Sequence, residues 1–239
     1  MFLDEFHKVE GHTVRISAQQ ASRFAKEIAD DFNPIHNPDA QRFCVPGDLL
    51  FSLVLAKYGI SPKMTFIFKG MVGDNDPLDF RPTDAKAFDI SNGADKVYLR
   101  VEREGEGEVL KNPALAETLS RNYVAFSGHN YPYTIQPLLT SQNVMLNPER
   151  PLVIYERMLF ELDRLDLENP TLEAKQAELV VNGKRGEVNL NFAVKSAGQT
   201  VGHGFKRLLV SGLIPHDDAV AEKLVATYLA LKTNYRATT

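Results

Sequence analysis

A short segment near the N-terminus combines the residue types that acid–base catalysis uses. Asp31 and His36 stand five positions apart, with Pro34 between them. A carboxylate and an imidazole held on one proline-fixed turn can share a water, so that one accepts its proton while the other orients it or returns a proton to the substrate. The spacing is also typical of a structural role, in which Asp31 and Asn33 cap the end of a helix and its turn, and His36 is a polar loop residue.

The helix that must position this segment is predicted over residues 17–33. Ser17 and Gln20 have the spacing of a capping box at its start. Pro34 disfavours helical geometry at Asn33, so the helix is expected to end there. Its apolar residues recur every three or four positions and predict one buried face: Ala21, Phe24, Ala25, Ile28, Ala29 and Phe32.

A second helix is predicted over residues 48–58. Asp48 is suited to the N-cap position and Gly59 to the stop. Residues 49–56 are apolar apart from Ser52, so this helix is expected to be buried on most faces. A short helix this apolar suggests a sheet wrapped around it.

Alternating apolar residues predict strands in both halves of the chain. In the first half they occupy residues 64–68, 85–90 and 96–104. In the second half they occupy residues 157–166, 174–182, 187–195 and 200–210, after a mixed or helical stretch at 115–146. Residues 105–108 are expected to form an acidic turn, and residues 217–232 an extra C-terminal helix.

A weak internal repeat links the two halves. Shifting the segment from Ser22 to Pro34 by 98 positions aligns three identical residues, Ser, Arg and Pro. The same shift places His129 and Thr134 where Asp31 and His36 stand, which gives no second acid–base pair. We therefore expect two related units side by side, an N-terminal unit at 1–112 and a C-terminal unit at 113–239.

Composition limits the class of protein. The 239 residues are 44% hydrophobic and 24% charged, as in an ordinary globular protein, and the net charge of −4 argues against nucleic acid or anionic lipid as the main partner. No apolar run reaches the roughly 20 residues of a membrane span, and the N-terminus does not resemble a signal peptide. The one cysteine, Cys44, cannot form an internal disulfide and is expected to be a small buried residue. Because the histidines lack a tight ligand spacing, no metal is expected. Because there is one cysteine and no signal peptide is recognised, the expected compartment is the cytoplasm.

The string Asp31-x-Asn33-Pro34-Ile35-His36 resembles the signature of the MaoC-like, (R)-specific enoyl-CoA hydratases of the hotdog fold. Phe24-Ala25 upstream and Gly47 before an apolar helix agree with that signature as well. The resemblance in motif covers about residues 15–60. It implies an α+β fold, a tandem hotdog in which each unit is a curved antiparallel sheet wrapped around a central helix.

The resemblance also implies an activity. Water would add to, or be lost across, the double bond of an enoyl or 3-hydroxyacyl thioester of CoA or a carrier protein, without a cofactor. Asp31 and His36 would activate the water and deliver the proton, and Asn33 would support their geometry. The thioester oxygen would be polarised by a backbone N–H near Gly47. The chain would be a monomeric pseudo-dimer or a homodimer.

Three departures from the signature keep other functions open. Asp30 replaces a glycine, the stretch from His36 to Gly47 is short, and Asp48 replaces an apolar residue. One alternative is a non-catalytic protein that binds acyl thioesters or has a regulatory role. Another is an acyl-CoA thioesterase that uses Asp48, which would then contact the substrate rather than only cap its helix.

Overall fold

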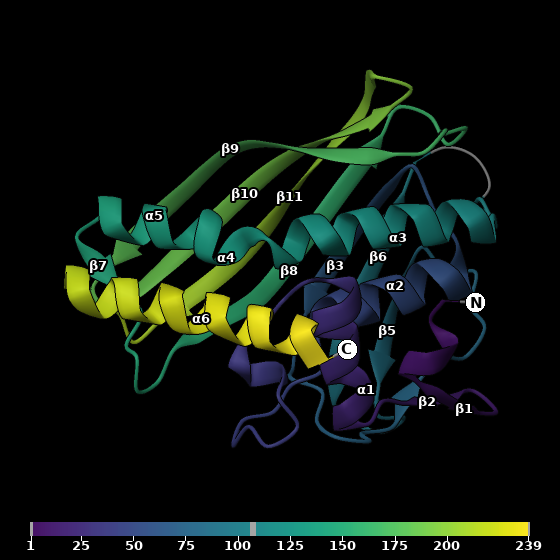
Figure 1. Ribbon diagram of the computed structural model, residues 1–239. Coiled ribbons are helices and arrows are strands. Elements are labelled where there is room, and N and C mark those ends of the chain that lie inside the picture. Colours follow the sequence, from purple (N-terminus) through teal and green to yellow (C-terminus); the bar gives the residue numbers. More distant parts are fainter. Residues whose placement is uncertain (1, 106–108, 239) are drawn as a thin grey trace.

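One continuous antiparallel sheet organises the chain, as the computed structural model of residues 2–105 and 109–238 shows (Figure 1). Its seven strands follow the order β5-β6-β3-β8-β11-β10-β9. The three from the first half are β3 (Lys63–Phe68), β5 (Ala87–Ser91) and β6 (Val97–Glu104). The four from the second half are β8 (Leu152–Leu162), β9 (Thr171–Asn182), β10 (Arg185–Ser196) and β11 (Gln199–Ser211).

The two halves meet where β3 pairs with β8. The register places Phe66 opposite Met158 and Lys63 opposite Glu161. The sheet has six neighbouring strand pairs, all antiparallel, and the other five pairs each lie within one half of the chain. Because hydrogen bonds cross it, the sheet is a single surface that serves both halves.

Helix α2 (Gly47–Tyr58) is the buried helix that the sequence predicts, and it begins one residue earlier than expected. Its side chains from Asp48 to Leu55 are all buried. The Phe51 ring lies 5.0 Å from that of Phe66 on β3 and 4.6 Å from that of Tyr123 on α3 (Pro113–Gly128). Burial on every side explains why this segment carries no polar face.

The first helix differs from its prediction. The capping box of Ser17 and Gln20 is confirmed at the start of α1 (Ala18–Arg23). The helix then widens into the π-helical turn η2 (Phe24–Ile28) and ends at Ala29, four residues before Asn33. Asp30 adopts a left-handed conformation with φ of 55°, which stops the helix before Pro34 can.

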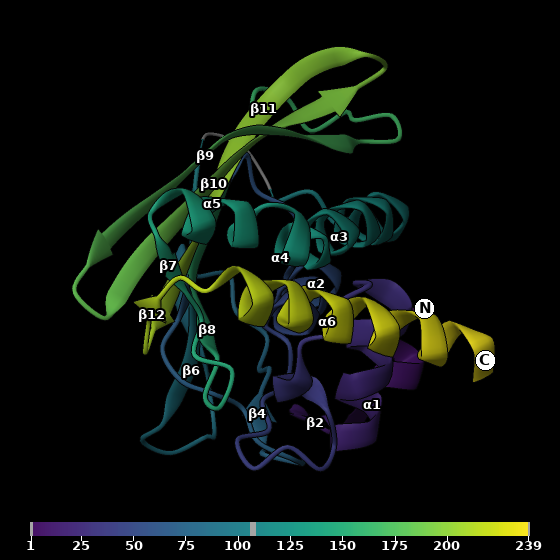
Figure 2. The same ribbon diagram turned by 60° about the vertical axis from the view of Figure 1, so that its left-hand side comes forward.

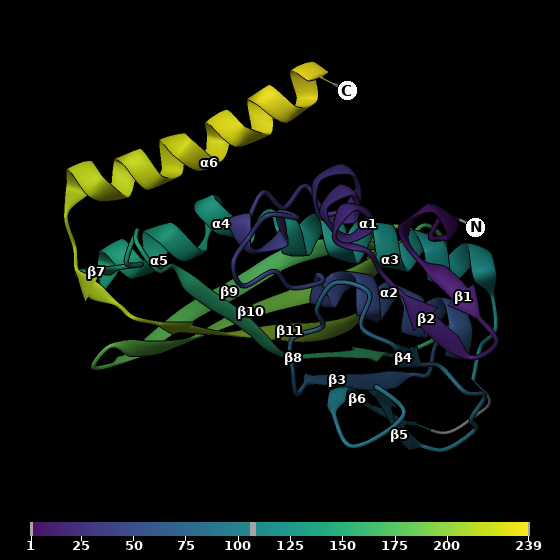
Figure 3. The ribbon, with the colours of Figure 1, turned by 90° about the horizontal axis from the view of Figure 1, so that it is seen from below.

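The second half places three helices, α3, α4 (Asn130–Tyr133) and α5 (Ile135–Ser141), over its strands. Helix α6 (Asp218–Thr238) is the predicted extra C-terminal helix and extends further than expected. Figure 3 shows that the sheet forms one layer and that α2, α3, α5 and α6 lie on the same side of it. Figure 2 shows α6 passing in front of α2.

The fold is therefore α+β, a tandem hotdog, with α2 on the strands of the first half and α3 to α5 on those of the second. The predicted acidic turn at 105–108 falls on residues 106–108, outside the described residues. The remaining short elements are η1 (Asp4–Phe6), β1 (Lys8–Glu10), β2 (Thr13–Arg15), η3 (Pro34–His36), β4 (Leu78–Asp79), β7 (Val144–Met145) and β12 (Ile214–Pro215).

Candidate active site

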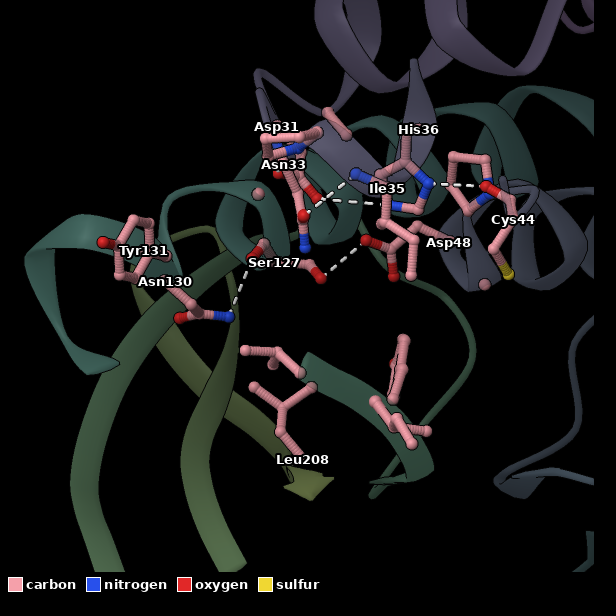
Figure 4. A pocket seen from close by; sticks show the side chains of 18 of the residues that line it. Asp31, Asn33, Ile35, His36, Cys44, Asp48, Ser127, Asn130, Tyr131 and Leu208 are labelled. Atoms are coloured by element: carbon pink, nitrogen blue, oxygen red, sulfur yellow. Dashed lines mark hydrogen bonds and ion pairs between the residues drawn. The ribbon is translucent and has the colours of Figure 1, made fainter. Parts of the chain in front are cut away.

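Asp31 and His36 lie side by side at the wall of a cavity (Figure 4). Asp31 Oδ2 is 3.6 Å from His36 Nε2. This separation is too long for a strong direct hydrogen bond but lets both atoms reach one water molecule. Both side chains are partly exposed, 26% for Asp31 and 12% for His36, so that a small molecule can contact them.

The left-handed turn at Asp30 aims Asp31 at His36. After this turn the Asp31 N–H donates to the Ala25 carbonyl at 2.7 Å. The Asn33 N–H donates to Asp31 Oδ1 at 2.9 Å, which leaves Oδ2 for His36. Aspartate tolerates this backbone conformation better than most residues. Asp30, which stands where the hydratase signature has a glycine, therefore preserves the turn.

His36 is held in one tautomer. Its Nδ1–H donates to the Cys44 carbonyl at 2.7 Å, because a carbonyl can only accept. The unprotonated Nε2 of the neutral ring therefore faces Asp31 and the cavity. The Cys44 N–H in turn donates to the Ile35 carbonyl at 3.0 Å, and Asn33 Oδ1 accepts from the Ile35 N–H at 3.2 Å.

Cys44 thus has a backbone role that its side chain did not indicate. The Cys44 side chain is half-buried, less buried than expected, and its burial raises the pKa of the thiol to about 11. A thiol with such a pKa stays protonated at neutral pH and is a poor nucleophile.

The start of α2 lines the same cavity at Gly47. A Cβ there would lie 2.9 Å from Phe68 Cε1 and 3.0 Å from Tyr155 Cδ1, so two aromatic rings close over this position. The first N–H groups of a helix have no intrahelical acceptor and carry its positive partial charge. The predicted place for polarising a carbonyl oxygen therefore lies in the same cavity as the Asp31–His36 pair.

Asp48 is not the N-cap of α2, contrary to the sequence prediction. Pro46 occupies that position, and Asp48 points from the first turn into the interior. Its Oδ2 accepts a hydrogen bond from Ser127 Oγ at 2.6 Å, and Lys206 Nζ donates to the same hydroxyl. Burial raises the pKa of Asp48, although Lys206 and Ser127 favour the charged form.

The Asp48–Ser127–Lys206 relay joins α2, α3 and β11 in the interior. The sequence prediction missed Ser127 and Lys206, which lie far from Asp48 along the chain. The sequence does contain one indication that Lys206 is buried. It lies on the inward-facing side of β11, between the buried Gly204 and Leu208. A lysine at such a position needs a buried partner.

The cavity has a volume of about 410 Å³ and two chemically different ends. The polar end is formed by Asp31, His36, Asp48, Ser127, Asn130 and Lys206. The other end is apolar and is lined by Ile135, Leu146, Val153, Leu208 and Leu224. This combination of a few convergent polar groups with an apolar chamber is typical of a small-molecule site.

The second-half counterparts of the pair do not form another site. His129 Nε2 lies 2.7 Å from Asp30 Oδ2. Thr134 is the residue between α4 and α5. Gly128 lies so close to the Asp31 turn that a Cβ would be 1.7 Å from the Ala29 carbonyl oxygen. The second half therefore packs against the backbone of the Asp31 turn through Gly128.

Two wider properties of the described residues bear on cofactors and membranes. Within residues 2–105 and 109–238, no group of three His, Cys, Asp or Glu side chains is arranged to hold a metal ion. None of the helices in these ranges combines the length and the apolar character of a membrane-crossing segment.

Comparisons with known proteins give one family and several similar folds. A search of the curated proteins finds no match. A solved acyl-CoA thioesterase II from Mycobacterium marinum is 8% identical, with a TM-score of 0.42 over 88% of this chain and 97% of that one. A conserved protein of unknown function with a hot dog fold from Alicyclobacillus acidocaldarius is 9% identical, with a TM-score of 0.43 over 89% of this chain and 98% of that one. A family model matches residues 1–219, and the chain belongs to the family described as "Protein of unknown function (DUF3581)".

Proposed function

We propose that the protein is a hydratase-like enzyme that adds water to enoyl thioesters, or removes it from 3-hydroxyacyl thioesters. The observation that carries the proposal is the Asp31–His36 pair, 3.6 Å apart at the polar end of an apolar cavity. The resemblance of residues 31–36 to the hydratase signature supports the same reaction. The substrate is an acyl thioester of CoA or of a carrier protein.

In the proposed reaction each group has its own role. A water between Asp31 Oδ2 and His36 Nε2 loses a proton to Nε2 as its oxygen bonds to C3 of the substrate. The same Nε2–H then delivers the proton to C2, so the net change is H and OH across the double bond. The Asp31 carboxylate orients the water and stabilises the transient imidazolium. Asn33 holds Asp31 through its backbone N–H, and the N–H groups at Gly47 polarise the thioester carbonyl.

The test follows two signals in one reaction. The purified protein is incubated with crotonyl-CoA and a longer enoyl-CoA, and loss of enoyl absorbance is recorded together with free thiol. Absorbance is expected to fall without thiol release. In the Asp31→Asn and His36→Ala variants turnover is expected to fall about 10²–10⁴-fold, the usual scale for acid–base groups. Unchanged turnover in both variants would exclude the assignment. His203→Ala, an exposed histidine on β11, is the matched control.

A thioesterase that uses Asp48 is the second candidate. The observation in its favour is that Asp48 lines the same cavity and that its pKa is raised by burial, as in many general bases. Against it, Asp48 Oδ1 is buried, and Oδ2 already accepts a hydrogen bond from Ser127 Oγ. Release of thiol that is lost in Asp48→Asn would establish this candidate.

A non-catalytic acyl-thioester-binding or regulatory protein is the remaining alternative. It predicts saturable binding of an acyl-CoA, by isothermal titration, with no chemical change in the ligand. We further propose that residues 1–112 and 113–239 are the two hotdog units, which form a monomeric pseudo-dimer or pair again as a homodimer. The cytoplasm is the proposed compartment, because the single cysteine serves no disulfide.

A further inference from the structure

Helix α6 forms one wall of the cavity, although most of it follows the part of the chain that the family model matches. Four of its side chains line the cavity: Leu224, Thr227, Tyr228 and Leu231. They recur at helical spacings of three and four, so they lie on one stripe. The stripe faces the same space as the Asp31–His36 pair.

Contacts on both sides of Asp31 fix this helix in place. The Phe32 N–H donates to Tyr228 Oη at 3.0 Å. Asp30 accepts hydrogen bonds from Lys232 and Arg236, the latter at 2.8 Å. The position of the helix relative to the reacting groups is therefore determined by the residues immediately before and after Asp31.

The stripe continues away from the polar end. Tyr228 is anchored beside Asp31, and Leu224 lies one turn earlier in α6, about 6 Å further along the helix axis. Figure 1 shows that α6 starts next to α5 and β7, in the second half, and runs towards α1. Leu224 therefore belongs to the apolar end of the cavity, together with Ile135 on α5 and Leu208 on β11.

An acyl group attached at the polar end must extend into this chamber. With its thioester carbon near Gly47 and Asp31, its alkyl part would contact mainly apolar side chains beyond Tyr131 and Tyr228. The sheet forms one wall of the chamber through Val153 and Leu208, and strand pairing fixes that wall. The opposite wall is α6, whose Tyr228, Lys232 and Arg236 side chains bind Phe32 and Asp30.

We propose that α6 determines the length of the acyl chain that the protein accepts, with Leu224 as the side chain that limits it. The proposal rests on the proposed function, since it takes an acyl thioester as the ligand. Leu224 is half-buried, whereas Tyr228 is buried and holds the Phe32 N–H. A change at Leu224 therefore alters the chamber without removing an anchor of the helix.

The experiment measures binding and turnover separately. Butyl, octyl and dodecyl thioethers of CoA, which cannot react, are titrated into the wild type and into Leu224→Ala and Leu224→Phe. Each dissociation constant is compared with that of the butyl compound. Turnover is then measured with enoyl-CoA substrates of matching length. Glu222→Ala, on an exposed position of α6, is the control.

We expect Leu224→Ala to improve dodecyl binding relative to butyl by about tenfold, and Leu224→Phe to weaken octyl binding by a similar factor, the scale for a few methylenes in an apolar pocket. Glu222→Ala should leave both ratios unchanged. Ratios that do not move in either Leu224 variant would overturn the proposal while leaving the hydratase assignment intact. Length-dependent binding without turnover would overturn the hydratase assignment alone. No binding of any thioether would overturn both.

Discussion

The segments around Asp31 and His129 occupy corresponding places in the repeat but have different structural roles. In the first half the chain leaves its helix at Asp30, in a left-handed turn, and presents Asp31 and His36 to the cavity. In the second half the chain stays mostly helical through α4 and α5, and His129 binds Asp30. The comparison shows how one copy of a repeat can keep the reacting groups while the other holds them in place.

The largest contrast is expected in turnover. Asp31→Asn and His36→Gln should each lower kcat about 10²–10⁴-fold, which corresponds to about 3–5 kcal/mol. The corresponding changes His129→Gln and Thr134→Val should lower kcat less than about threefold, because neither residue contacts the reacting atoms. Steady-state kinetics on all four variants checks this. Equal losses in the two halves would contradict the comparison.

The next largest effect concerns the support that the second half gives. Gly128→Ala would place a Cβ 1.7 Å from the Ala29 carbonyl oxygen, a backbone atom that cannot rotate away. Urea unfolding should show a loss of about 3 kcal/mol in the free energy of unfolding. The control is Gly70→Ala, where the nearest atom would be at an ordinary 3.4 Å. An equally stable Gly128→Ala protein would mean that the Asp31 turn is not held by this contact.

A smaller effect is expected at Ser127, where α3 meets α2. Ser127→Ala removes a hydrogen bond to Asp48 and one from Lys206, and it leaves both charged groups buried. The expected cost is about 2–3 kcal/mol in the free energy of unfolding. Ser141→Ala, on an exposed position of α5, should cost less than about 0.5 kcal/mol. Similar melting temperatures for the two variants would show that the relay adds nothing to stability.

The smallest effect concerns Asp30 and its dependence on pH. Burial opposes ionisation of Asp30, but hydrogen bonds from Lys232 and His129 and the charge of Arg236 outweigh it and lower its pKa. An acid whose pKa is lowered by folding adds stability above its ordinary pKa of about 4, and this contribution is lost as the pH falls through the lower, folded pKa. Asp30→Asn should therefore cost about 1 kcal/mol at pH 7 and nothing once Asp30 is protonated.

Thermal unfolding between neutral and acid pH measures this difference. Asp218→Asn is the control, since the Asp218 side chain is 92% exposed at the start of the same helix. A stability difference between wild type and Asp30→Asn that stays constant into acid would show that the charge of Asp30 is not what holds α6.

Much of the fold follows from local patterns in the sequence. Alternation predicts the four long strands of the second half, with starts and ends displaced by up to five residues. The apolar run of α2, interrupted only at Ser52, predicts the burial of that helix. The predicted end of the first helix was wrong. The helix ends before Asp30, whose position is fixed by the contact of the neighbouring backbone with Gly128 and by the hydrogen bonds of Asp30 to α6. Such contacts join residues about a hundred or two hundred positions apart, and no local pattern records them.

The candidate site divides in the same way. Asp31, Asn33, His36 and Gly47 could be predicted, because they lie within one short segment and its following helix. Ser127, Lys206 and Tyr228 could not, because the sheet and α6 bring them to the cavity from the second half. Asp48 was predicted as a cap because aspartate is common there, but the buried Ser127 and Lys206 offer it partners in the interior instead.

The pairing of β3 with β8 has a consequence for how the chain is made. During synthesis, β3, β5 and β6 leave the ribosome long before residues 152–162, so β3 has no partner on one side while α3 to α5 are still being translated. An unpaired strand that carries Met64 and Phe66 is a surface on which nascent chains associate. Completion of the sheet must wait for β8, and we expect slow folding that is limited by this long-range pairing.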